Sequence, residues 1–247
     1  MSVQASFPPV GTERYRVHFA ANEQDLWAAQ RLRFEVFNLE LNEGLVASHM
    51  IGRDEDGFDP VCEHLLVTDQ ADGKVVGTYR MQAGLSAAAH LGYYSEQEFD
   101  FGPFAARRGE ILELGRACVA AEHRNQSVLS LLWRAIMQHA RRRGQRYLIG
   151  CSSLSSLDEA GGLETYRNLA AHYLAAPEWR TRPVASCRCR SGTADALAVP
   201  RLMVAYLAAG ARVCGEPAID REFGTIDFLT VLDLDALSPR FARKYLA

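Results

Sequence analysis

The feature that most restricts the fold of this chain is a buried strand, residues 111–119, that leads through a short turn into an amphipathic helix, residues 127–143. The helix carries apolar side chains at positions 128, 131, 132, 135 and 136, a spacing that puts them on one face. Gly144 ends the helix, and residues 146–151 have the composition of a further buried strand. A strand, a helix and a strand in this order predict a layered α/β fold.

The remaining periodic segments fit one mixed α/β domain. A strand is predicted at 15–20, followed by a helix over 23–41 with Asn22 as its N-cap. Asp72-Gly73 separates two β-rich runs and predicts a hairpin. Further elements are expected at 95–99, 164–175, 211–214 and 225–234, and in a helix that Pro200 opens as its first residue. No repeat or linker interrupts them, so residues 13–247 are expected to form a single domain after a flexible arm, residues 1–12.

Composition excludes several classes of protein. The 247 residues are 48% hydrophobic and carry a formal charge of -3, without the positive excess of a general nucleic-acid binder. The longest apolar runs fall short of the roughly 20 residues that span a bilayer, and the first twenty residues do not resemble a signal peptide. We therefore expect a cytoplasmic protein. The six cysteines form no CxxC pair, which predicts free thiols and no metal site, although Cys187 and Cys189 lie close in sequence.

The turn between the strand and the helix is the first candidate for chemistry. A helix N-terminus leaves backbone N–H groups unpaired, and together with the helix dipole these groups bind anions. Arg116 and Arg124 would strengthen such a site for a phosphate or pyrophosphate. The turn has neither the glycines nor the lysine of the known phosphate-binding loops, so an ordinary connection without a ligand stays open.

Glu113 and Arg116 are the polar residues of the otherwise apolar strand. A charge in such a strand costs free energy unless it is paired or functional. A partly desolvated carboxylate has a raised pKa and can accept a proton from an amine. A structural ion pair with a partner elsewhere is the alternative.

Two further segments have a strong charge bias. Seven carboxylates lie between positions 40 and 63 against one arginine, Arg53, and on charge alone this segment resembles a solvated loop. Residues 179–193 contain four arginines and no acid.

Several segments resemble a known family. ELGRACV (113–119), the pair HR (123–124) and LLWRAI (131–136) are similar to motif A of the GNAT acyltransferase superfamily. Six further segments are similar to one branch of this superfamily, the branch shared by acyl-homoserine-lactone synthases and ornithine-lipid N-acyltransferases. They are RLRFEVFNLELN (31–42), DGFDPVCEHLLV (56–67), VVGTYRM (75–81), GYYSEQEFDF (92–101), YLIGCSSL (147–154) and residues 201–232. The resemblance implies an α/β, GNAT-like mixed and mostly antiparallel sheet with helices on both faces, splayed between the strands at about 111–119 and 146–151.

The same resemblance implies an N-acyltransferase. Its donor would be a long-chain acyl thioester on phosphopantetheine, carried by acyl carrier protein, and its acceptor the α-amine of an amino acid such as ornithine, with no tightly bound cofactor. The arm would pair with strand 113–119 and place its phosphate on the turn at 121–127. The family's glycines are absent from that turn, which reads RNQSVL (124–129). Glycine allows close approach of a backbone to a diphosphate, so their loss disfavours coenzyme A.

The resemblance also assigns roles to charged residues. The shared polar cluster is Arg33, Asp56, Asp59, Arg80, Glu113 and Arg116. Glu113 would deprotonate the attacking amine through a water, with Arg116 beside it. Asp56 and Asp59 would hold ammonium groups, and Arg80 or Arg116 would meet a carboxylate. The donor would be bound by the backbone of Cys118 and Val119, which would stabilise the oxyanion, and by Arg124, Asn125, Gln126 and Ser127.

Partners and alternatives follow from the same chemistry. Acyl carrier protein is acidic, so the basic residues Arg124, Arg134, Arg141, Arg142, Arg143 and Arg146 would form its docking surface, unless they are only a solvated helix face. An amphiphilic product makes peripheral contact of the C-terminal tail with inner-leaflet lipid a hypothesis. A coenzyme A-dependent N-acetyltransferase, a homoserine-lactone synthase and a non-catalytic binding module stay as alternatives. Covalent catalysis by Cys118 or Cys151 is disfavoured because neither has an obvious histidine partner.

Overall fold

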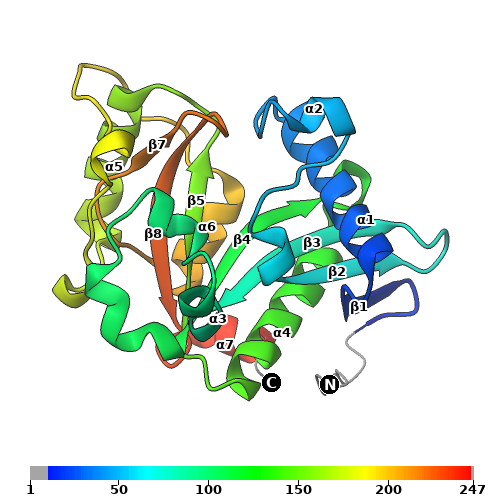
Figure 1. Cartoon of the computed structure of the whole chain (residues 1–247). Helices are drawn as coiled ribbons and strands as arrows, with labels where there is room; N and C mark the ends of the chain where they lie inside the picture. Colours follow the sequence, from blue (N-terminus) through cyan, green and yellow to red (C-terminus); the bar gives the residue numbers. More distant parts are fainter. Residues whose placement is uncertain (1–10, 246–247) are drawn as a thin grey trace.

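One continuous sheet of eight strands crosses the molecule in the computed structural model, which describes residues 11–245 (Figure 1). The strands are β1 (Tyr15–Phe19), β2 (Glu63–Asp69), β3 (Val75–Ala83), β4 (Ile111–Val119), β5 (Tyr147–Leu154), β6 (Arg212–Val213), β7 (Ala218–Asp220) and β8 (Thr225–Asp233). Their order is β1-β2-β3-β4-β5-β8-β6, and β7 also pairs with β8. Only β4 and β5 run parallel, so the predicted mixed, mostly antiparallel sheet is confirmed. Most of the predicted N-terminal arm lies outside the described residues.

Helices cover both faces of the sheet, as predicted. They are α1 (Glu23–Phe34), α2 (Ser48–Ile51), α3 (Gly84–Ala89), α4 (Gln126–Arg142), α5 (Glu159–Tyr173), α6 (Arg201–Ala209) and α7 (Pro239–Tyr245). Successive side chains of a strand point to opposite faces. On β3, Tyr79 and Met81 join the apolar core under α4, whereas Arg80 points to the other face and meets Asp59 below α1.

The local signals in the sequence act as expected at three places. Asn22 caps α1, because its side chain accepts a hydrogen bond from the N–H of Asp25 at 2.9 Å. The Asp72-Gly73 pair turns the β2–β3 hairpin, with Gly73 in the left-handed region at φ 75°. The strand–turn–helix segment forms β4 and α4 nearly at the predicted bounds.

Several elements differ from the predictions. The helix predicted over 23–41 ends as an α-helix at Phe34 and continues as a π-helical turn, Glu35–Glu40, in which Val36, Phe37 and Asn38 are all buried. Pro200 is the N-cap of α6 and not its first residue. The short strand β7 was not expected.

Helix α5 begins at Glu159, five residues before the predicted start at 164. The sequence does not predict a helix at Gly161 and Gly162 because glycine disfavours a helix interior. The structure shows why Gly162 is needed: a Cβ there would lie 2.7 Å from Ile226 Cγ2. Asp158 caps the helix by accepting from the N–H of Gly161 at 3.0 Å.

The two central strands separate after three residue pairs, which confirms the predicted splay. β4 and β5 pair only from Ile111 to Glu113 with Tyr147 to Ile149, while β4 continues along β3 and β5 continues along β8. The divergence is visible at the centre of Figure 1. We call the space that it opens the β4–β5 gap.

Within the described part of the chain, residues 11–245, no helix combines the length and apolar character that membrane crossing requires. The six cysteines are free thiols, as predicted.

Candidate active site

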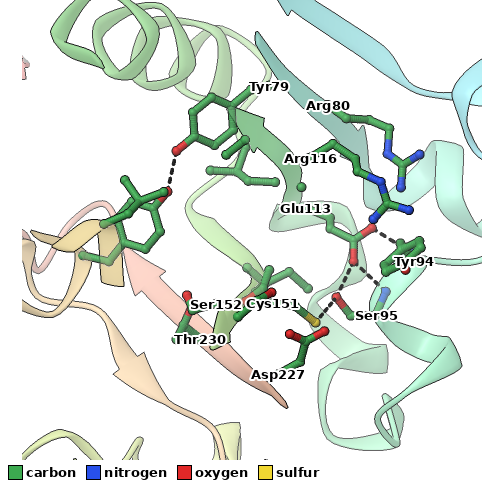
Figure 2. A pocket seen from close by; sticks show the side chains of 18 of the residues that line it. Tyr79, Arg80, Tyr94, Ser95, Glu113, Arg116, Cys151, Ser152, Asp227 and Thr230 are labelled. Atoms are coloured by element: carbon green, nitrogen blue, oxygen red, sulfur yellow. Dashed lines mark hydrogen bonds between the residues drawn. The ribbon is translucent and has the colours of Figure 1, made fainter. Parts of the chain in front are cut away.

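A cavity of about 350 Å³ occupies the β4–β5 gap (Figure 2). One part of its wall is polar and includes Tyr94, Ser95, Glu113, Arg116, Asp220 and Asp227. Another part is largely apolar and includes Tyr79, Trp133, Leu148, Met203, Tyr206 and Leu232. The Tyr79 and Tyr206 hydroxyls hydrogen-bond to each other on this apolar side. The cavity can therefore hold a molecule with a polar group and an apolar chain.

A bulge in β4 brings Glu113 and Arg116 to this one cavity. Residues three positions apart in a regular strand point to opposite faces. Here the register shifts: Thr78 pairs with Cys118, but Arg80 pairs with Gly115, so β4 holds one extra residue. Arg116 has a left-handed backbone at φ 48°, and both charged side chains then line the cavity. Strain of this kind in a residue other than glycine is concentrated at functional sites.

Glu113 is buried and held by three donors. Its Oε2 accepts from the N–H of Tyr94 at 2.8 Å, and its Oε1 accepts from the N–H and the Oγ of Ser95 at 2.9 and 2.7 Å (Figure 2). Burial raises the pKa of Glu113, and the hydrogen bonds from Ser95 and Tyr94 limit the rise. Among the described residues no cation pairs with Glu113 within 4 Å, so the alternative of a structural ion pair does not describe it. A carboxylate placed in this way can act as a general base.

Arg33 is the centre of a buried ionic network. Its side chain is fully buried, and its Nε and Nη1 atoms lie 2.7 Å from Asp54 Oδ2 and 2.9 Å from Asp59 Oδ1. Gln30 donates to Asp59 Oδ2 at 2.9 Å. Burial alone would raise the pKa of Asp59, but Arg33 and Arg80 outweigh it and hold that pKa well below its usual range.

Arg80 and Arg116 extend this network to the cavity wall. Arg80 Nη1 lies 2.6 Å from Asp56 Oδ1 and 2.9 Å from Asp59 Oδ1, and Arg116 Nη2 lies 3.0 Å from Asp56 Oδ2. The ring of Tyr94 lies against both guanidinium groups. Three arginines thus neutralise three aspartates, with Asp54 as a member that the sequence analysis missed. The solvated-loop interpretation is wrong for Asp54 and Asp59, because Arg33 holds both inside the molecule.

The predicted phosphate-binding turn lies beside the end of β4, but part of it is already paired. Asn125 Oδ1 accepts from the N–H groups of Ser127 and Val128 at 3.0 and 3.2 Å, and so caps α4. Arg124 forms a two-pronged ion pair with Glu40 and donates to the carbonyl of Val119 at 3.1 Å. The expectation of unpaired helix amides therefore fails at Ser127 and Val128, because the Asn125 side chain serves as their acceptor. Gln126 begins the helix, and Cys118 is buried at the end of the strand.

The predicted docking arginines are distributed over the surface near α4. Arg143 pairs with Glu63, and Arg146 pairs with Asp233 and Asp235. Arg134, Arg141 and Arg142 are exposed. Acidic partners thus offset part of the positive charge of the predicted docking surface, at Arg143 and Arg146.

Several polar residues of the cavity region escaped the sequence analysis, among them Tyr94, Ser95, Glu98, Asp220 and Asp227. One signal was present. Asp227 is a charged residue inside the buried strand β8, the same pattern that singled out Glu113 in β4. Cys151, considered as a nucleophile, lies 3.4 Å from Ser95 Oγ, and burial raises the pKa of its thiol.

Comparison with known proteins gives the site its context. Residues 32–134 match the family described as Acetyltransferase (GNAT) domain. The L-ornithine N(alpha)-acyltransferase of Agrobacterium fabrum is 32% identical over 97% of this chain and 87% of its own. The protein of the same name from Rhodobacter capsulatus is 31% identical over 94% of each chain.

Solved structures share the fold at low sequence identity. The acyl-homoserine-lactone synthase LasI is 12% identical over 94% of each chain, with a TM-score of 0.52. FeeM, an N-acyl amino acid synthase from uncultured soil microbes, is 11% identical over 90% of this chain and 92% of its own, with a TM-score of 0.54. The splayed sheet and the relatives that align with nearly the whole chain agree with the family that the sequence motifs indicated. The chain belongs to the L-ornithine N(alpha)-acyltransferase branch of the GNAT acyltransferases and is an N-acyltransferase.

Proposed function

We propose that this enzyme transfers a long-chain fatty acyl group from acyl carrier protein to the α-amine of ornithine, forming a lyso-ornithine lipid. The acceptor is inferred from relatives whose names specify L-ornithine and that align with nearly the whole chain. The observation that carries the reaction type is Glu113, a buried carboxylate at the polar side of a cavity that also has an apolar wall.

The donor would lie in the β4–β5 gap. Successive residues of a strand direct their N–H groups to opposite edges, so part of the backbone from Leu114 to Val119 faces this gap, where β5 has moved away. Those N–H groups would pair with the amides of a pantetheine arm and, near Cys118 and Val119, stabilise the oxyanion that forms from the thioester. Because Asn125 already occupies two amides of α4, the turn suits the single phosphate of a carrier protein better than a diphosphate.

The chemistry needs one base. The acceptor's ammonium group loses a proton to Glu113, directly or through a water, and the neutral amine attacks the carbonyl carbon of the thioester. The carbon–sulfur bond then breaks, the amide forms, and the thiolate takes the second proton of the nitrogen. Arg116 or Arg80, which line the polar wall, would meet the carboxylate of the acceptor.

The acyl chain would lie along the apolar wall. Trp133, Leu148, Met203 and Leu232 offer apolar surface there, and each buried methylene group contributes about 0.8 kcal/mol to binding. A long chain is therefore favoured over an acetyl group.

The test is an assay of the purified enzyme with ornithine and, side by side, palmitoyl-acyl carrier protein, palmitoyl-coenzyme A and acetyl-coenzyme A. We expect mass spectrometry to detect N-acylornithine, with the carrier protein as the preferred donor. Glu113→Gln is expected to lower the rate about 10²- to 10⁴-fold without a loss of folded protein. Preference for acetyl-coenzyme A would contradict the proposal, and an unchanged rate in the variant would remove Glu113 from the mechanism.

A further inference from the structure

A second group of carboxyls lies at the cavity, on the side of Cys151. Asp227 on β8 and Asp220 at the end of β7 line the cavity, and Figure 2 shows the Asp227 carboxyl beside the Cys151 sulfur. Glu98 adjoins them: one donor atom from each of Glu98, Cys151 and Asp227 lies within 4.8 Å of the others. Asp220 and Asp227 lie on the β7–β8 hairpin, and the fold brings Glu98 to them from a distant part of the chain.

The charge of this group is not balanced. Within residues 11–245, no Lys, Arg or His side chain lies within 4 Å of the carboxyl of Glu98, Asp220 or Asp227. The network around Arg33, on the same cavity, has one arginine for each aspartate. The aspartates around Arg33 are therefore neutralised by arginines of the protein, whereas Glu98, Asp220 and Asp227 can receive a cation from a ligand.

Two buried oxygens of the group have no partner. Glu98 and Asp227 are each only 4% exposed, yet Glu98 Oε1 and Asp227 Oδ1 make no hydrogen bond with any described residue. A buried polar atom without a partner costs about 1–3 kcal/mol, and more when it is charged. Burial raises the pKa of both carboxyls, and repulsion from Asp220 adds to the rise at each. A hydrogen bond between Glu98 and Asp227 raises the pKa of Glu98 further and lowers that of Asp227. A bound cation would remove both the unpaired oxygens and the repulsion.

The group lies close to the proposed base. Ser95 Oγ is 2.7 Å from Glu113 Oε1 and 3.4 Å from Cys151 Sγ, and Cys151 Sγ is 3.7 Å from Glu98 Oε2. In ornithine five single bonds separate the two nitrogens, which places them about 6 Å apart in the extended molecule. The proposed base and the acidic group thus lie on either side of Ser95 and Cys151, an arrangement that suits an acceptor with two nitrogens.

We propose that Asp227, Asp220 and Glu98 form the binding site for the terminal ammonium group of a diamino-acid acceptor, and so determine which amino acid is acylated. This inference rests on the proposed N-acyl transfer. It moves the ammonium-binding role away from Asp56 and Asp59, whose carboxylates are already paired with arginines. The unpaired oxygens of Glu98 and Asp227 are free to accept charge-assisted hydrogen bonds from an ammonium group.

The test compares two acceptors that differ only in the terminal nitrogen. Ornithine and norvaline share a five-carbon skeleton, and norvaline lacks the second amine. We expect the wild-type enzyme to favour ornithine in kcat/KM, and Asp227→Asn and the double variant Glu98→Gln/Asp227→Asn to lower this preference at least about tenfold, mainly through KM for ornithine. Asp72→Asn, on the exposed β2–β3 turn, is the matched control. The ratio of the two acceptors does not depend on the fraction of folded enzyme.

Each outcome has one meaning. An unchanged preference in the double variant overturns the ammonium site while N-acyl transfer stands. Equal kcat/KM of the wild-type enzyme for ornithine and norvaline would also overturn the ammonium site and leave N-acyl transfer intact. A loss of activity with both acceptors after treatment with a chelator, restored by a divalent metal, would assign Glu98, Cys151 and Asp227 to a metal instead. No transfer to either acceptor from any acyl thioester would overturn the proposed function, and this inference with it.

Discussion

The Oγ atom of Ser95 lies 2.7 Å from Oε1 of Glu113, and the backbone N–H of Ser95 donates to the same oxygen at 2.9 Å. Ser95 belongs to a 3-10 turn, Tyr94–Gln97, and Glu113 to the central strand β4. The proposed base is therefore oriented by a segment 18 residues away in sequence. These contacts fix the position of the carboxylate and also limit the rise in its pKa.

Ser95→Ala tests this relationship. Loss of the hydroxyl removes a donor that stabilises the ionised form, so the pKa of Glu113 rises further. The base works only when ionised, and activity is lost as the pH falls through its pKa. We therefore expect the acid limb of the kcat/KM profile to move to higher pH in Ser95→Ala, with Ser186→Ala, an exposed serine, as the control. If the pH profiles of Ser95→Ala and the wild type coincide, Ser95 does not influence the pKa of the catalytic base.

Gly150→Ala tests the point where the two central strands diverge. A Cβ at this position would lie 2.1 Å from the carbonyl oxygen of Leu114, which is backbone and cannot rotate away. We expect a loss of about 1–3 kcal/mol in stability together with a large loss of activity, measured by thermal unfolding and by acyl transfer. Gly109→Ala is the matched control, because a Cβ at that position would have no heavy atom within 4 Å beyond its chain neighbours. Equal behaviour of the two variants would contradict the close approach of β5 to β4.

Arg33→Met tests the buried network. The variant leaves Asp54 and Asp59 without their main partner, and breaking such a pair costs about 3–5 kcal/mol. Arg14→Ala removes an ion pair whose arginine is largely exposed to water, and the loss of stability should be much smaller. Urea denaturation at pH 7 measures both. Similar small losses would show that the network contributes little.

The same network predicts an acid response. The pKa of Asp59 is lowered in the folded protein, so its stabilising contribution is present above the unfolded value of about 3.9 and is lost as the pH falls below it. The unfolding free energy of the wild type should thus fall more steeply below about pH 4 than that of Asp59→Asn. Parallel curves for the two proteins would contradict this assignment.

Asp227→Asn is expected to stabilise the enzyme without acceptor. The pKa of Asp227 is raised by burial and by the charge of Asp220, so the wild type loses stability as the pH rises above the unfolded value. The variant should gain about 1 kcal/mol at pH 7, or about 2–4 °C in Tm for a chain of this size, and little at pH 4. A lower Tm at pH 7 would indicate that the carboxyl is already satisfied in the free enzyme.

Sequence reasoning succeeded where short-range rules act. The cap at Asn22, the Asp72-Gly73 turn and the β4–α4 segment each depend on a few neighbouring residues, and each is where the pattern placed it. The start of α5 was missed because glycines at 161 and 162 disfavour a helix interior. Their role is steric and depends on Ile226, a residue more than sixty positions away.

What the sequence by itself determined is the order of the elements, the family and the presence of a charged residue in an apolar strand at Glu113, because periodicity, capping and motifs are local properties of the chain. Only the tertiary structure decided which charges meet. Asp59 is paired with Arg33 whereas Asp227 faces the cavity without a cation, and a bulge turns Arg116 to the side of Glu113. Both outcomes follow from long-range packing, which sets the distance between side chains and the water around them, and with these the role that each charge can play.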